Sequence, residues 1–293
     1  MKKVVLFFAL IVGLLASAST AMAQTVNMSR YITLTVGSGE DIKLDFKAAA
    51  DGTPVRIVSG SNTQDITVGT NWYNGSNPST FTVTADGTEM KVYGDIIGFD
   101  CNSNIKNITA IDVSHNTQLT YLDCSGNKIS SLDVSGCTQL DTLFCFYNKL
   151  SSLDLSKNTE LFVLNCNDNK LSRLDISKNT KLMILGIWGN NFSTATLDAI
   201  YCRIPDMTGQ PRKGYILPIH ETSSATEQNN VNATNAKNAT DKNWRVVMYK
   251  NDNNVADITT TGNYNCNSTG IAEAIDEQAL TFYPNPVVEV LYL

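Results

Sequence analysis

The chain has 293 residues, of which 28 are acidic and 22 basic, and its formal net charge is −6. This excess of acid disfavours nucleic acids and anionic membrane surfaces as partners, because both are bound through clustered Lys and Arg. An apolar content of 42% is sufficient for an ordered chain with a core.

The N-terminus has the pattern of a secretory signal peptide. Lys2 and Lys3 precede an apolar run over residues 4–15, and small residues lead to the cleavage site Ala21-Met22-Ala23. The run is shorter than the roughly 18 apolar residues that a spanning helix needs, and no later stretch approaches that length. We therefore expect cleavage of residues 1–23, no membrane insertion, and a mature chain that is secreted or on the outer cell surface.

Residues 24–95 alternate apolar and polar side chains in short runs, which turn signals such as Asp86-Gly87 separate. Strands are expected at Tyr31–Val36, Asp41–Phe46, Val55–Val58, Ile66–Val68, Phe81–Ala85 and Met90–Tyr93. This pattern predicts a small all-β cap domain that covers the start of the following repeats. An independent ligand-binding module is the alternative.

A 21-residue repeat occupies residues 96–205. Its pattern, Leu-x-x-Leu-x-Cys-x-x-Asn-x-apolar, opens at Leu119, Leu140, Leu161 and Leu182, with a looser copy at Ile96. One coil cannot bury its own apolar residues, so successive coils must stack. The alternating Leu-x-Cys segments then predict short strands that form a parallel sheet.

Three polar or thiol positions recur in register, and each has a structural explanation. The Asn position is expected to satisfy backbone groups inside the turn. The Cys position predicts buried reduced thiols, because strands about 4.8 Å apart hold them side by side rather than facing. The Asp position is expected to cap the N–H two residues on, in preference to a row of calcium sites. The residues at the Asn position are Asn127, Asn148, Asn169 and Asn190. Those at the Cys position are Cys101, Cys124, Cys145 and Cys166, and those at the Asp position are Asp112, Asp133, Asp154 and Asp175.

These residues closely resemble the 21-residue leucine-rich repeats of exported Bacteroidetes proteins, which are similar in style to the internalins. The resemblance spans Ile96 to Pro205. It implies a right-handed leucine-rich-repeat solenoid with a parallel concave β-sheet and a convex side of turns or short 3₁₀ pieces. The departures are a 23-residue first step, Cys137 where other coils have Asn, and a last coil in which Thr196–Tyr201 predicts a capping helix.

Residues 206–250 are expected to form a C-terminal cap, with strands at Gly214–Ile219 and Trp244–Tyr249, and residues 251–279 a linker. Cys202 and Cys266 lie outside the cysteine repeat, and the sequence leaves open whether they pair.

Residues 280–293 contain Tyr283-Pro284-Asn285-Pro286-Val287 followed by alternating apolar residues. This segment resembles the opening of the C-terminal sorting domain of Bacteroidetes type IX secretion cargo. The family's domain continues through further strands, whereas this sequence stops at Leu293. A working sorting signal and a simple terminal hairpin therefore both stay open.

The sequence contains no catalytic motif: phosphate-binding loops, H-E-x-x-H and G-x-S-x-G are all absent, and His115 and His220 are far apart. We expect a protein that is not an enzyme, with no catalytic residues, metal site or cofactor.

The side chains that flank the inward Leu and Cys of each strand point out of the concave face. An aromatic row there has no role in folding, and exposed aromatic patches are typical of contact sites. The predicted contact residues are Tyr121, Asp123, Phe144, Phe146, Tyr147, Asn165, Asn167 and Trp188. We predict adhesion-like recognition of a protein on a host or bacterial surface. Glycan binding and a purely structural surface role are the alternatives.

Overall fold

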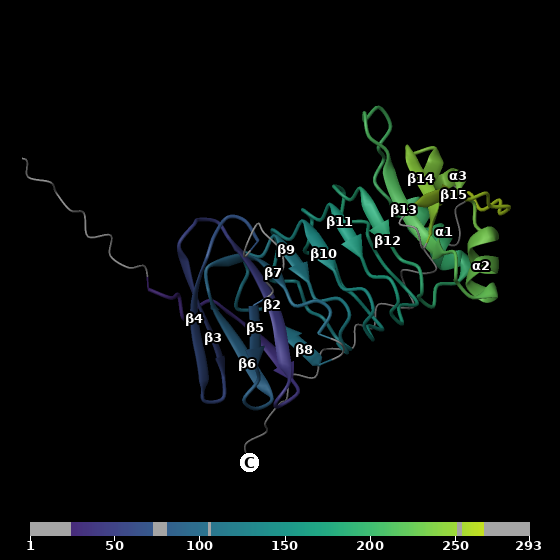
Figure 1. Ribbon diagram of the computed structural model, residues 1–293. Coiled ribbons are helices and arrows are strands. Elements are labelled where there is room, and N and C mark those ends of the chain that lie inside the picture. The colour runs from purple at the N-terminus through teal and green to yellow at the C-terminus, as the bar shows by residue number, and fades with distance from the viewer. Residues whose placement is uncertain (1–24, 73–80, 105–106, 251–253, 267–293) are drawn as a thin grey trace, which may run out of the picture.

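The computed structural model describes residues 25–72, 81–104, 107–250 and 254–266. The expected signal peptide and the sorting-like segment 280–293 lie outside the described residues. The molecule is elongated, and three parts follow one another along it (Figure 1). They are an N-terminal β unit, a stack of coils and a C-terminal unit, which contains the helices. Of the described part of the chain, no helix is both long and apolar enough to cross a membrane.

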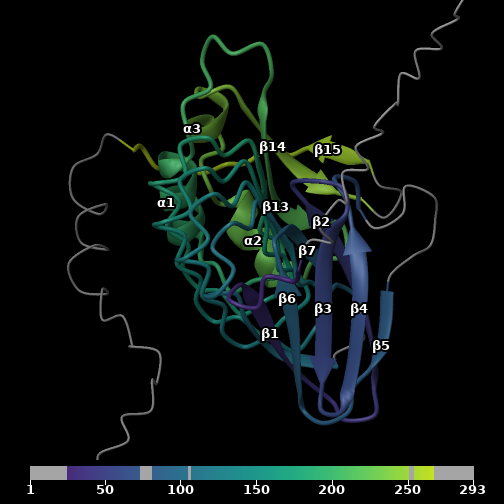
Figure 2. The same ribbon diagram turned by 90° about the vertical axis from the view of Figure 1, so that its left-hand side faces the viewer.

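The expected N-terminal strands are confirmed, with small shifts at their ends. They are β1 (Tyr31–Val36), β2 (Asp41–Ala48), β3 (Thr53–Ser59), β4 (Asn62–Val68), β5 (Phe81–Thr84) and β6 (Glu89–Gly94). Strands β3, β4 and β6 lie in front when the molecule is viewed from this end, with the coils behind them (Figure 2). Inward side chains such as Leu34 and Leu44 are fully buried, as the alternation requires.

The β unit is continuous with the repeats through two sheets. One sheet has the order β4-β3-β6-β1-β8, in which β8 (Ile108–Asp112) belongs to the first coil. The other joins β5 and β2 to β7 (Ile96–Asp100), where the parallel sheet of the repeats begins. The β unit therefore shares backbone hydrogen bonds with the repeats, and its core and theirs are a single cluster.

The repeat strands pair in parallel and in register. They are β7, β9 (Tyr121–Asp123), β10 (Thr142–Phe144), β11 (Val163–Asn165) and β12 (Ile184–Gly186). The central Leu of each strand aligns with the next, so Leu122, Leu143 and Leu164 form a buried column. The same sheet continues through β13 (Gly214–His220) and β14 (Trp244–Tyr249), which are also parallel.

The three roles assigned to the recurrent polar and thiol positions are confirmed. The Asn169 amide donates to the carbonyls of Cys145, Cys166 and Asn167 at 3.0–3.1 Å and accepts from the Leu150 N–H at 2.9 Å. The four repeated cysteines are buried free thiols, and burial raises their pKa. The four repeated aspartates each accept from the N–H two residues on at 2.8–2.9 Å.

The C-terminal unit carries three helices and a short antiparallel strand. Helix α1 (Thr194–Arg203) starts at the Ser193 cap and includes the expected 196–201 segment. It is followed by α2 (Ala225–Asn232) and α3 (Lys237–Thr240), and β15 (Val255–Asp257) pairs with β14.

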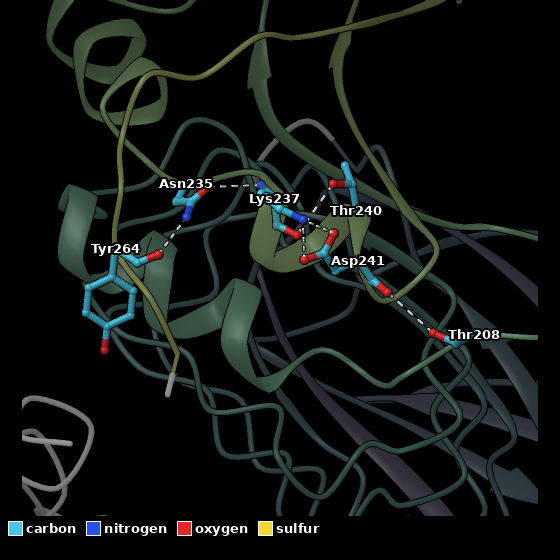
Figure 3. A network of polar contacts seen from close by, with 6 residues as sticks. All are labelled: Thr208, Asn235, Lys237, Thr240, Asp241 and Tyr264. Carbon is cyan, nitrogen blue, oxygen red and sulfur yellow. Dashed lines mark hydrogen bonds and ion pairs between the residues drawn. The ribbon is translucent and has the colours of Figure 1, made fainter. Parts of the chain in front are cut away.

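The prediction of a linker over 251–279 is wrong for its described part. Besides the β15 pairing, Cys202 and Cys266 form a disulfide with their Cα atoms 5.5 Å apart. Polar contacts add to this, since Asn235 donates to the Tyr264 carbonyl at 2.7 Å beside the Lys237–Asp241 ion pair (Figure 3). The segment to Cys266 is therefore part of the C-terminal unit.

Candidate partner-binding face

Five aromatic side chains form a continuous row along one face of the repeat sheet, which we call the aromatic strip: Trp72, Tyr121, Phe144, Phe146 and Tyr147. Successive ring centroids are 4.7, 5.7, 6.4 and 5.7 Å apart, all with edge-on geometry. Such spacings are those of favourable aromatic pairs. The Tyr147 side chain is 59% exposed and the rest are partly buried, so each ring stabilises its neighbours and still faces solvent.

Trp72 was not foreseen from the sequence. It follows β4, outside the repeats, and packs on Gly98, where a Cβ would lie 2.9 Å from the indole. No repeat position or strand alternation marks this residue in the sequence. Its place on the face follows only from the pairing of β2 with β7, which brings the β unit beside the first coils.

Two of the predicted contact residues are not exposed, which corrects the expectation that they point into solvent. Asp123 is 6% exposed and accepts from the Ser125 N–H and hydroxyl at 2.9 and 2.6 Å. Asn167 is 1% exposed and lies over Gly186, where a Cβ would come within 3.1 Å of both amide atoms. Strand alternation predicts the face of a side chain but not whether neighbouring side chains cover it.

Three carboxylates lie on adjacent strands at the N-terminal end of this face. Asp45 is paired with Asp100, and Asp100 with Asp123. Burial, and then the charge of Asp123, raises the pKa of Asp100 to about 7, although Asn102 donates to it at 2.8 and 2.9 Å. Burial also raises the pKa of Asp123. The charge of this end of the face therefore changes near neutral pH.

A cleft of about 630 Å³ lies at the other end of the face, between the last coil and α2. We call it the C-terminal cleft. Its lining includes Tyr147, Asp168, Trp188, the turn Gly189–Ser193, His220 and Glu227. Trp188 and Tyr147 were predicted contact residues, whereas Asp168, His220 and Glu227 were not. The sequence offers no signal that would place Glu227 of α2 beside the last coil.

Hydrogen bonds hold the walls of the C-terminal cleft. Asp168 has a left-handed backbone with φ 49°, and its carboxylate accepts from the Trp188 indole at 3.1 Å. Glu227 accepts from the Gly189 N–H at 2.6 Å, which ties α2 to the coil. Burial raises the pKa of Asp168, and the charge of Glu227 adds to the rise.

The remaining predicted residue, Asn165, is partly buried between Phe144 and Gly186 in the sheet register. The structure thus brings Tyr121, Phe144, Phe146 and Tyr147 into one strip and places Trp188 separately, in the cleft. Within the described ranges, no group of His, Cys, Asp and Glu side chains is arranged to hold a metal ion.

Comparison with known proteins identifies the repeats. A family model described as Leucine Rich repeats (2 copies) matches residues 117–158, and the chain has a leucine-rich-repeat type of fold. No curated protein matches the chain. A solved structure, the functional domain of InlJ from Listeria monocytogenes, which is described as including a cysteine ladder, is 27% identical with a TM-score of 0.39. The match covers 53% of this chain and 30% of that one.

Proposed function

We propose that this protein is a secreted or cell-surface recognition protein that binds a protein partner through the concave face of its repeats. The aromatic strip carries the proposal. Leucine-rich-repeat domains are typically protein-interaction modules, and the curved sheet of a solenoid is an extended binding surface. Tyr and Trp are favoured anchors in protein interfaces because they bury a large area at a low cost in side-chain entropy.

The repeat fold does not require aromatic residues at the positions of the aromatic strip. Positions aligned with Asp123 in neighbouring strands hold Phe144, Asn165 and Gly186, so the face varies from coil to coil. The interior positions stay Leu, Cys and Asn in the same coils, except that Ile187 takes the Cys position in the last one. Because the repeat tolerates polar residues on the face, a row of aromatic rings there is best explained by contact with another molecule.

Secretion and a non-catalytic role are parts of the same proposal. The signal-peptide pattern in residues 1–23 and the sorting-like segment at 280–293 support export. The Cys202–Cys266 disulfide fits an oxidising compartment, in which such bonds persist. The surroundings of His220 support a non-catalytic role. Its Nδ1 accepts a hydrogen bond from the Thr222 N–H, so this nitrogen is already used within a local turn.

Glycan binding is the second candidate, and the setting of Asn165 favours it. Asn165 is partly exposed and is aligned with Phe144 of the aromatic strip. Aromatic rings beside amides suit the apolar faces and hydroxyl groups of sugars, so this part of the face is also suited to a glycan.

The experiment measures binding of the labelled secreted protein to intact host and bacterial cells. We expect the Phe144→Ala/Phe146→Ala variant to lose at least about tenfold in affinity, because alanine substitution at interface hot spots costs about 2 kcal/mol or more. Phe162→Ala is the matched control, since Phe162 is 42% exposed and lies outside the aromatic strip. Circular dichroism and urea unfolding verify that both variants fold.

Treatment of the cells separates the candidates. Protease treatment should abolish binding and glycosidase treatment should leave it intact if the partner is a protein. The reverse pattern, supported by signals on a glycan array, would assign the face to glycans. Equal binding by the folded strip variant and the wild type would overturn the concave-face proposal.

A further inference from the structure

The C-terminal cleft carries a feature that the aromatic strip lacks, namely a pair of carboxylates. Asp168 and Glu227 both line it, and of the described residues in its walls none is Lys or Arg. The pKa of Asp168 is raised by burial and by the charge of Glu227. Hydrogen bonds from Trp188 and Tyr147 and the nearby His220 offset part of the cost of ionising Asp168 in this partly enclosed space. A cationic ligand would offset more of it, because it would interact with both carboxylates.

Two backbone donors of the cleft, those of Gly189 and Glu227, are already satisfied, which argues against an anion. The Gly189 N–H donates to Glu227 at 2.6 Å. At the start of α2, the Glu227 N–H donates to the Ser224 hydroxyl at 3.2 Å. The helix N-terminus therefore has its own acidic residue and its own cap, and an incoming anion would meet two carboxylates.

Aromatic rings form another wall of the cleft. The Trp188 ring is stacked on Tyr249, with centroids 5.1 Å apart and planes at 9°, and His220 lies 5.7 Å from both. Tyr147 contributes an exposed ring from the coil that precedes that of Asp168. Flat π surfaces attract cations, and they attract a planar guanidinium in particular because it can also stack.

We propose that the C-terminal cleft receives an arginine side chain of the protein partner. The guanidinium would lie against Trp188 and donate to the carboxylates of Asp168 and Glu227. Its fork of N–H donors can reach two carboxylates at once, which a lysine ammonium does less well. This inference rests on the proposed function, since the cleft continues the concave face and shares Tyr147 with the aromatic strip. Its carboxylates, Asp168 and Glu227, lie outside the strip, and the inference predicts the chemistry of one partner residue.

The test uses small probes in place of the unidentified partner. The full secreted chain is titrated with Nα-acetyl-arginine amide while the indole N–H resonance of Trp188, assigned with Trp188→Phe, is followed by NMR. Nα-acetyl-citrulline amide, which has the same shape without the charge, is the control ligand. We expect the arginine probe to shift the Trp188 resonance and to bind at least tenfold more tightly than citrulline.

Variants locate the charge that matters. Asp168→Asn and Glu227→Gln keep hydrogen-bond acceptors for Trp188 and Gly189 but remove one charge each, and each should weaken the arginine probe about tenfold. Glu160→Gln, which removes one charge outside the cleft, should change nothing. The Phe144→Ala/Phe146→Ala variant should bind the probe normally, so loss of the strip and loss of the cleft are distinguishable.

Three results would overturn the inference: equal binding of the arginine and citrulline probes, tighter binding of Nα-acetyl-lysine amide than of the arginine probe, or unchanged binding in a folded Asp168→Asn/Glu227→Gln double variant. Urea unfolding of each variant provides the check on folding. None of these results depends on the Phe144 and Phe146 side chains or on cell binding. The proposed function is therefore tested separately, by the cell-binding experiment.

Discussion

The interior of the coils and the sheet face that carries the aromatic strip follow opposite rules. Inside, the same residue recurs at the same position because each one serves the same backbone groups; Asn148, Asn169 and Asn190 make matching hydrogen bonds. On the face, the position aligned with Phe144 holds Asp100 and Asp123 in the preceding coils and Asn165 and Gly186 in the following ones. In this molecule, residues that recur from coil to coil therefore serve folding. Residues that vary on the face indicate where the surface contacts another molecule.

The largest expected effect comes from breaking the interior. Asn169→Ala removes a donor to three carbonyls and the acceptor of the Leu150 N–H. Because buried polar groups lose about 1–3 kcal/mol each when left unpaired, we expect the free energy of unfolding to fall by about 3–5 kcal/mol. Urea unfolding measures this. Asn191→Ala, at an exposed amide, is the control, and a loss below about 1 kcal/mol in Asn169→Ala would contradict the comparison.

The second prediction concerns a face position that is partly buried. The folded-state pKa of Asp100 is about 7, above its usual value of 3.8, so the folded protein binds more protons than the unfolded chain between those values. Stability must then fall as pH rises through this window. At about 1.4 kcal/mol per pH unit, the free energy of unfolding should be about 2 kcal/mol larger at pH 5.5 than at pH 7.5.

Asp100→Asn removes this titration, so the pH dependence of its unfolding free energy between these values should become flatter. Asp141→Asn, at an exposed position of the same repeat sheet, serves as the control variant. A slope that persists unchanged in Asp100→Asn would show that another group is responsible.

A smaller effect is expected on the exposed turn of each coil. Asp154 accepts from the Ser156 N–H at 2.9 Å, and Asp154→Ala removes that bond at the surface, where water can replace it. The expected loss is about 0.5–1 kcal/mol in urea unfolding. Asp154→Asn keeps an acceptor and should lose less than Asp154→Ala. Equal losses in the two variants would mean that the cap is not what the side chain contributes.

The smallest effect is predicted for an exposed ion pair. Lys181 pairs with Glu160, and their side chains are 57% and 40% exposed. Exposed pairs contribute about 0–1 kcal/mol, so Lys181→Ala should change the unfolding free energy by no more than about 0.5 kcal/mol. A loss comparable to that of Asn169→Ala would break the distinction between interior and surface.

Much of the fold was predictable from the sequence, because each repeat contains the residues that determine its own geometry. The Leu column, the reduced thiols, the Asn amides and the Asp caps all follow from patterns within 21 residues. The strands before and after the repeats were also predicted, since alternation and turn residues are local. The four aromatic residues of the strip that lie in the repeats were predicted for the same reason.

The rest of the candidate site depends on segments that meet only in three dimensions. Trp72 reaches the strip from the β unit, and Glu227 reaches the cleft from α2. The burial of Asp123 and Asn167 results from neighbours that strand alternation does not reveal. The Cys202–Cys266 pairing joins positions 64 residues apart, which spacing alone could not decide.

The sequence by itself determined the coil, because one 21-residue pattern carries its apolar column, its turn and its cap, and stacking is then the only way to bury the column. The tertiary structure alone decided which side chains the face with the aromatic strip presents at its two ends. There, side chains from the β unit and α2 meet those of the coils, and only their packing determines which carboxylates are buried and where a cleft remains open.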